Sequence, residues 1–324
     1  MKVLKFVIAI ILTVALLKVA STNSRGRPEL VTGTDNGYTF EYTTVPKGLE
    51  FTEVRIPLII TGDFSGGQSP VFRYTTEGQN ATTDFLLYAA TPLLAADSLT
   101  DEYYTEITVG QKGKRFYYYV QIVDSTGAAI ASFTEPDSKP FLFKYIGEVP
   151  KIAFLLHIIM IFASVFFISI ASVNSVALVR GSTDTRPAAR YFLVAAICAF
   201  LGCYPFGIPM NWYAFGVSWE GVPFGTDATD NKTQLLFVYL LFMVLAMWRS
   251  VTNGKMGRDI FTPKALGWFG IFAFVNMLAI YLIPHSIQFS AALTYSVCYT
   301  YIGLFALVYL IGLVNVRKTA AQSG

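Results

Sequence analysis

The fold of this chain is decided where residues 141–179 read FLFKYIGEVPKIAFLLHIIMIFASVFFISIASVNSVALV. The first six residues, FLFKYI, form a short aromatic and apolar run typical of a β-strand. From Ile152 to Val179 there is no Asp, Glu, Lys or Arg, and this run is longer than the roughly 20 apolar residues that cross a bilayer as a helix. The stretch therefore predicts a boundary at Val149-Pro150-Lys151, with a β domain before it and a membrane domain after it.

The composition of the whole chain supports a membrane protein. Of its 324 residues, 54% are hydrophobic and only 14% are charged, whereas soluble domains have roughly 25% charged residues. The net charge is +3, and the basic residues stand at the ends of apolar segments instead of forming one patch, so nucleic-acid binding is not supported. Cys198, Cys203 and Cys298 all lie in apolar segments without a CxxC pair, and we expect them to be buried small hydrophobes.

The first 21 residues resemble a targeting segment. Lys2 and Lys5 precede an apolar core from Phe6 to Leu17, and small residues follow at Val19-Ala20-Ser21. This order predicts a secretory signal peptide over residues 1–21. Because Lys18 stands close to the cleavage position, an uncleaved signal anchor is the alternative. Either interpretation predicts that the following domain is exported.

Residues 25–148 predict an exported all-β domain. Short runs with β-strand composition alternate with Gly-, Asp- and Ser-rich turns, and this spacing favours an Ig-like β-sandwich. In the run RFYYYVQIVD, alternation places Phe116, Tyr118, Val120 and Ile122 on one face. The runs are VRIPLII (54–60), VFRYTTE (71–77), DFLLYAA (84–90), EYYTEITV (102–109), RFYYYVQIVD (115–124) and FLFKYI (141–146).

Residues 149–324 predict an all-α domain of five transmembrane helices. The expected spans are Ile152–Val179, Tyr191–Ile208, about Asn231–Trp248, Ala265–Ile283 and about Phe289–Val316. The fold class is therefore mixed, an Ig-like sandwich followed by a five-helix membrane domain. The five spans show no inverted repeat, and no carboxylate stands mid-membrane, so transport is the least favoured function.

Basic residues predict the orientation of this domain. They gather in the connections after the first and third spans and in the C-terminal tail, which the positive-inside rule places in the cytoplasm. The β domain would then be periplasmic or extracytoplasmic, the membrane would be the bacterial inner membrane, and the C-terminus would be cytoplasmic. The residues are Arg180, Arg186, Arg190, Arg249, Lys255, Arg258, Lys264, Arg317 and Lys318.

Titratable residues of the membrane domain gather at its predicted outer rim. His157 stands about six residues into the first span, and His285 follows the fourth span. The long connection 207–234 adds Glu220, Asp227 and Asp230. Ionisable groups at membrane depth are costly and indicate function by default. We therefore take these five residues as candidate metal ligands.

Three chemical interpretations remain open for this rim. Imidazoles with carboxylates suit a zinc or copper ion, and two histidines on facing helices suit a haem. A quinone or lipid headgroup could instead bind between a histidine and the aromatic walls Trp212, Tyr213 and Trp219. In the structural alternative, His157 hydrogen-bonds a neighbouring helix and His285 caps a helix.

The acidic end of the connection also has a structural interpretation. Asp230 precedes an apolar run and is expected to be the N-cap of the third span, with Asp227 and Thr229 as alternative caps. Trp212, Tyr213 and Trp219 suit an interfacial aromatic belt. Gly216, Gly221 and Gly225, with Pro223, predict a folded segment instead of a loose tether. We expect this segment to close as a lid over the two histidines.

Three segments together resemble a family of bacterial envelope membrane proteins. They are KYIGEVPKIAFLLHIIM, YAFGVSWEGVPFGTDATDNKT and LIPHS, beginning at Lys144, Tyr213 and Leu282. The resemblance implies an exported Ig-like domain joined to a multi-span domain, and it brings no activity. An acidic residue soon after IPHS would complete the family pattern, but QFSAA supplies none here.

The sequence thus favours an accessory or structural subunit of the envelope, whose β-sandwich docks another envelope protein while the membrane half anchors it in the bilayer. A redox or metal-binding membrane protein is the alternative, and a quinone- or lipid-binding pocket is the third. The sequence does not identify an enzymatic reaction.

Overall fold

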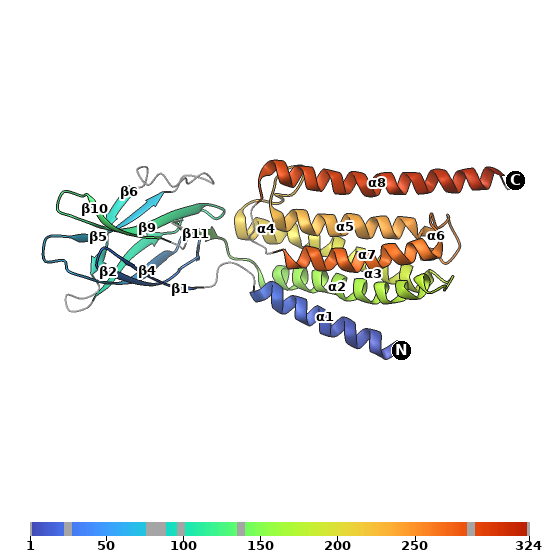
Figure 1. Cartoon of the computed structure of the whole chain (residues 1–324), viewed down its shortest axis with the longest axis horizontal. Coiled ribbons are helices and arrows are strands. Elements are labelled where there is room, and N and C mark those ends of the chain that lie inside the picture. Colours follow the sequence, from blue (N-terminus) through green and yellow to red (C-terminus); the bar gives the residue numbers. More distant parts are fainter. Residues whose placement is uncertain are drawn as a thin grey trace. The chain divides into compact units, whose positions relative to one another are not determined.

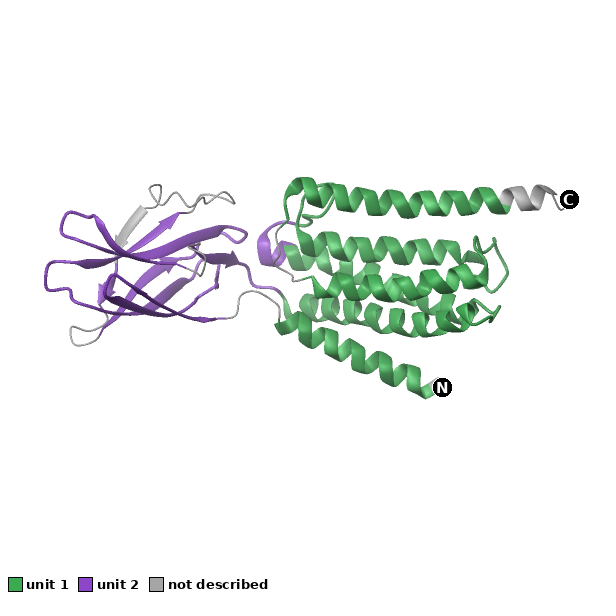
Figure 2. Cartoon of the chain, in the orientation of Figure 1, with its two compact units in different colours: residues 1–25, 150–211, 218–324 green, residues 26–149, 212–217 purple. Residues whose placement is uncertain are grey.

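The computed structural model describes residues 2–22, 28–75, 89–95, 101–134, 140–283 and 289–322. The chain divides into two compact units (Figure 2). The helical unit comprises residues 1–25, 150–211 and 218–324, and the β unit comprises residues 26–149 and 212–217. The short segment Trp212–Val217 thus groups with the β unit, although it follows the second predicted span in the sequence.

The β unit consists of two sheets (Figure 1). The first has the order β1 (Leu30–Asp35), β2 (Tyr38–Thr43), β4 (Glu53–Thr61), β8 (Glu102–Thr108) and β7 (Leu94–Ala95). The second has the order β3 (Lys47–Leu49), β11 (Phe141–Ile146), β9 (Arg115–Val123), β5 (Ser69–Thr75) and β6 (Ala89–Pro92), and β10 (Ala129–Phe133) pairs with β9. Among these strands, β3 and β11 pair parallel and the other pairs are antiparallel.

The two sheets share one aromatic core. In β9, Phe116, Tyr118, Val120 and Ile122, which were predicted to share one face, all belong to this core. The hydroxyls of Tyr42 and Tyr118 hydrogen-bond each other, and the Tyr42 oxygen also accepts the N–H of Val45 at 2.8 Å. Both tyrosine hydroxyls thereby have hydrogen-bond partners inside an apolar interior, as burial requires.

Most predicted strands of this unit are confirmed within a few residues. The runs at 54–60, 71–77, 102–109, 115–124 and 141–146 correspond to β4, β5, β8, β9 and β11. The run 84–90 lies mostly outside the described residues. The sequence did not predict β1, β2, β3, β7 or β10; in β2, aromatic residues alternate with threonine and glutamate. The Ig-like assignment stays a prediction.

The helical unit is built around α2 (Lys151–Val179), which packs against α1 (Lys2–Thr22), α3 (Arg186–Cys203) and α7 (Pro263–Leu282). Next to these lies α5 (Ala228–Ala246), which packs against α3, α7 and α8 (Ala291–Gln322) (Figure 1). Two short helices, α4 (Gly207–Phe215) and α6 (Trp248–Val251), complete the secondary structure.

Small residues let the helices approach closely. A Cβ on Gly270 of α7 would lie 2.0 Å from the Ser175 hydroxyl of α2, so only glycine fits there. Ser172 of α2 donates to the Gly270 carbonyl at 2.8 Å, and Tyr239 of α5 donates to the Phe269 carbonyl at 2.7 Å. Close backbones and interhelical hydrogen bonds are the usual means of association for membrane helices.

Among the described residues, five helices are long and apolar enough to cross a membrane, as in a membrane protein. They begin at Val3, Lys151, Arg186, Pro263 and Ala291. The predicted number is five, but the set differs from the prediction. The N-terminal helix α1 is included, whereas α5 is not, because its first residues, ATDNKTQ, lower its mean hydropathy. The second candidate runs through α3 and α4 to Phe215, beyond the predicted end at Ile208.

Candidate functional site

The connection that follows α3 folds into ordered structure. A turn at Tyr204–Phe206 leads into α4, which ends where Gly216 takes φ +76° and donates its N–H to the Trp212 carbonyl at 3.0 Å. A left-handed glycine is the common end of a helix. Farther on, the carbonyl of Gly221 accepts the N–H groups of Phe224 and Gly225 at 2.9 and 3.0 Å. The predicted folded segment is therefore confirmed for these residues.

The first turn of α5 fastens this connection through side chains. The Asp230 carboxylate accepts the Glu220 N–H at 2.8 Å and the Asn211 amide at 3.0 and 3.2 Å. The Asn231 side-chain oxygen accepts the N–H of Val222 at 2.7 Å. Because Asp230 and Asn231 are both buried, these bonds hold the loop backbone directly against the start of the helix.

The predicted N-cap at Asp230 is wrong. Asp227 caps α5 instead, since its carboxylate accepts the N–H groups of Thr229 and Asp230 at 2.8 and 3.0 Å. Of the two alternative caps considered from the sequence, Asp227 is therefore the correct one and Thr229 is not. Asp230 lies one turn later and uses its carboxylate for the loop. Both carboxylates thus have structural partners, and the Glu220 side chain is exposed.

His157 hydrogen-bonds a neighbouring helix, as the structural interpretation predicted. Its Nδ1 lies 2.9 Å from the Gly202 carbonyl of α3. A carbonyl can only accept, so Nδ1 carries the proton and Nε2 remains as the nitrogen able to bind a metal or another donor. A Cβ on Gly207 would lie 3.5 Å from Nδ1. The junction of α3 and α4 therefore lies beside this imidazole.

The candidate residues are only partly brought together. Trp219 packs on Tyr204 with ring centroids 5.2 Å apart, and so it belongs to the helical unit, whereas Trp212 and Tyr213 belong to the β unit and are exposed. Among the residues that the structure describes, no group of three or more His, Cys, Asp or Glu could hold a metal ion. His285 lies outside the described residues, so its pairing with His157, and the lid over both, stay predictions.

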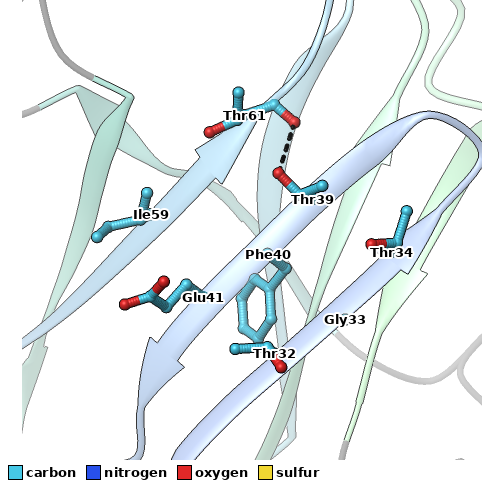
Figure 3. A pocket seen from close by; sticks show the side chains of 8 residues that line it. All are labelled: Thr32, Gly33, Thr34, Thr39, Phe40, Glu41, Ile59 and Thr61. Carbon is cyan, nitrogen blue, oxygen red and sulfur yellow. Dashed lines mark hydrogen bonds between the residues drawn. The ribbon is translucent and has the colours of Figure 1, made fainter.

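A second candidate site lies on the outer face of the first sheet, where β1, β2 and β4 form a groove with a volume of about 460 Å³ (Figure 3). Strand register builds two rows of side chains across it. One row is Thr34, Thr39 and Thr61, and the other is Thr32, Glu41 and Ile59. The Thr39 hydroxyl contacts the Thr61 carbonyl at 3.5 Å, drawn as the dashed line in Figure 3.

This groove combines groups that a docking surface uses. It offers four threonine hydroxyls and the Glu41 carboxylate, and the Ile59 side chain beside them is 41% exposed. No sequence motif had identified these residues. The signal available was the alternation of threonine and glutamate with buried aromatics in YTFEYT (38–43), whose burial alternates in the same way.

Comparison with known proteins adds no relative, since no family model matches the sequence and no curated protein matches it.

Proposed function

We propose that this chain is an accessory or structural subunit of the bacterial cell envelope, with its helices in the inner membrane and its β unit, an Ig-like domain, exported and docking a partner protein. The observation that carries the proposal is the groove across β1, β2 and β4. Its hydroxyls, carboxylate and exposed isoleucine suit the mixed polar and apolar surface of another protein. The carboxylates of Asp227 and Asp230, in contrast, already accept hydrogen bonds from within the chain.

Contacts among the basic connections support the proposed orientation. Arg190 in the first turns of α3 donates to the Asn253 side chain at 2.8 Å, so the start of α3 and the segment after α6 meet. The hydroxyls of Thr185 and Ser250 lie within hydrogen-bond distance of each other and of the Asp259 carboxylate. The two segments that carry most of the predicted cytoplasmic arginines and lysines therefore lie at one end of the helical unit, as the positive-inside rule requires.

The packing of α1 favours the anchor over the cleaved signal peptide. Lys5 donates to the Asn174 side chain of α2 at 3.1 Å, and its ammonium lies 5.4 Å from the Tyr191 ring centroid. Ala9 and Leu16 are buried. These contacts place the start of α1 beside the later part of α2, so the two helices are antiparallel. In the proposed orientation, the N-terminus is therefore cytoplasmic.

Site-specific photo-crosslinking in native membranes tests the docking proposal. A photo-reactive residue at Thr39 should form one discrete crosslinked product, while the same residue at Ser125, in the exposed turn between β9 and β10, should not. Glu41→Lys should abolish the product at Thr39, because it reverses the only charge of the groove. Glu53→Lys, an equally exposed change at the start of β4, is the matched control. Equal products at Thr39 and Ser125 would reject the groove as the docking surface.

The redox alternative is tested on the same purified protein by its visible spectrum and metal content. His157 keeps Nε2 as a potential ligand, and a haem band or stoichiometric copper or zinc that is lost in both His157→Ala and His285→Ala would replace the docking proposal. A quinone or lipid headgroup at this rim would instead be extracted with organic solvent.

A further inference from the structure

A second groove lies in the helical unit, whereas the first lies on the β unit. It is at the end of the helical unit that carries the basic connections. It is formed by the end of α5, the start of α6, the segment 257–260 and the later part of α8, and its volume is about 450 Å³. Leu245, Leu313 and Val316 supply an apolar wall, and Trp248, Tyr309 and Arg258 supply polar groups. Tyr309, Leu313 and Val316 are spaced four and three residues apart, and so they follow one face of α8.

The polar groups of this groove are hydrogen-bond donors without acceptors. Among the described residues, neither the Arg258 guanidinium nor the Trp248 indole N–H nor the Tyr309 hydroxyl has a hydrogen bond or ion pair. Among the described contacts the neighbouring Asp259 makes no ion pair with Arg258; its carboxylate accepts from the Ser250 N–H at 3.0 Å and lies within hydrogen-bond distance of the Ser250 and Thr185 hydroxyls. The Arg258 guanidinium is therefore exposed and available to an anionic group that enters the groove.

Two glycines shape this groove, because each lets a neighbouring group approach closely. Gly257 has φ +70°, and a Cβ there would lie 2.6 Å from Cδ1 of Trp248. Any other residue would displace the indole from the wall. A Cβ on Gly312 of α8 would lie 2.2 Å from the Ile260 side chain, so glycine lets α8 lie directly against the segment that carries Arg258.

We propose that this groove binds an anionic phospholipid, with the phosphate on Arg258 and an acyl chain along Leu245, Leu313 and Val316. Arginine is suited to phosphate because its planar guanidinium donates two parallel hydrogen bonds. Tryptophan and tyrosine favour the boundary between headgroups and hydrocarbon, and Trp248 and Tyr309 add donors at that level. Basic pockets between helices on the cytoplasmic side are a known arrangement for anionic headgroups. Only the choice of leaflet rests on the proposed orientation.

The test is native mass spectrometry of the full-length protein with phosphatidylglycerol or phosphatidylcholine of identical acyl chains. Wild-type protein should retain phosphatidylglycerol selectively, and Arg258→Gln should bind it about tenfold more weakly, since a charge-assisted phosphate contact is lost. Lys255→Gln removes an exposed cation in the same connection but outside the groove lining, and it should bind as wild type does. Equal binding by Arg258→Gln, or equal binding of phosphatidylcholine, would overturn the proposal.

A second variant separates a lipid from other occupants. Leu313→Gln should weaken long-chain phosphatidylglycerol more than a short-chain analogue, because only the long chain reaches the apolar wall. Displacement of the lipid by millimolar inorganic phosphate would mean a free-anion site and would reject the proposal. A dimer in the same spectra whose formation excludes the lipid would assign the groove to a second copy of the chain and would also reject it.

Discussion

Asp230→Ala tests whether the first turn of α5 holds the preceding connection in place. The substitution removes the acceptor of the Glu220 N–H and of the Asn211 amide, which now bind the carboxylate at 2.8 Å and at 3.0 and 3.2 Å. Leaving one such buried group without a partner costs about 1–3 kcal/mol. For the Glu220 N–H alone, this corresponds to an opening equilibrium about 5- to 150-fold more favourable, since about 1.4 kcal/mol is a factor of ten.

Hydrogen–deuterium exchange of the protein in lipid nanodiscs measures this opening. Peptides covering residues 218–226 should exchange faster in Asp230→Ala by that factor, because amide exchange reports local opening. Peptides from α7 should exchange as in the wild type. Asp230→Asn keeps an acceptor oxygen and should show a smaller increase. Asn231→Ala is the matched variant, since it removes the acceptor of the Val222 N–H.

Two results would refute this reasoning. Unchanged exchange over residues 218–226 would mean that backbone turns hold the connection without the Asp230 carboxylate. Uniformly faster exchange in α2, α5 and α7 would mean that Asp230 stabilises the whole helical unit, and that the loop is not a separately opening segment.

Three further predictions concern other parts of the chain. Burial raises the pKa of Tyr42 to about 12, above the ordinary value of about 10, so the folded β unit binds this proton more tightly than the unfolded chain. Its stability should therefore fall as pH rises from about 10 to about 12, and thermal unfolding should show a smaller fall in Tyr42→Phe. The intact mass of protein purified from membranes should include α1, because Lys5 bonds Asn174; a mass beginning after residue 21 would show cleavage. Gly225→Val should make the connection more sensitive to limited proteolysis, since a Cβ there would lie 2.4 Å from the Glu220 carbonyl oxygen, and unchanged cleavage would show that the turn adapts.

Local patterns predicted the elements whose environment is uniform along their length. The apolar run from Ile152 to Val179 is almost the whole of α2, because a helix surrounded by lipid and other helices needs apolar residues on every side. In β9, alternation was sufficient because one face of the strand packs in a core. The apolar later part of α5 likewise led to its prediction as an ordinary span. The polar residues of its first turn hydrogen-bond to other segments of the chain. A mean hydropathy contains no information about such partners.

Pairing between segments decided what local patterns left open. Composition favoured Asp230 as the cap, with Asp227 and Thr229 as alternatives, and the actual choice depends on where the Glu220 backbone and the Asn211 side chain come to lie. The groove on β1, β2 and β4 exists only through strand register, which aligns Thr34, Thr39 and Thr61 from three strands.

The sequence by itself determined that a β-rich half precedes a membrane half, because hydrophobic periodicity and run length depend on each segment's own residues. The tertiary structure alone decided which side chains meet: α1 against α2, and the connection against α5, while Arg258 makes no ion pair with any residue that the structure describes. Such contacts join residues far apart in the chain, and their energies depend on distances that no local pattern contains.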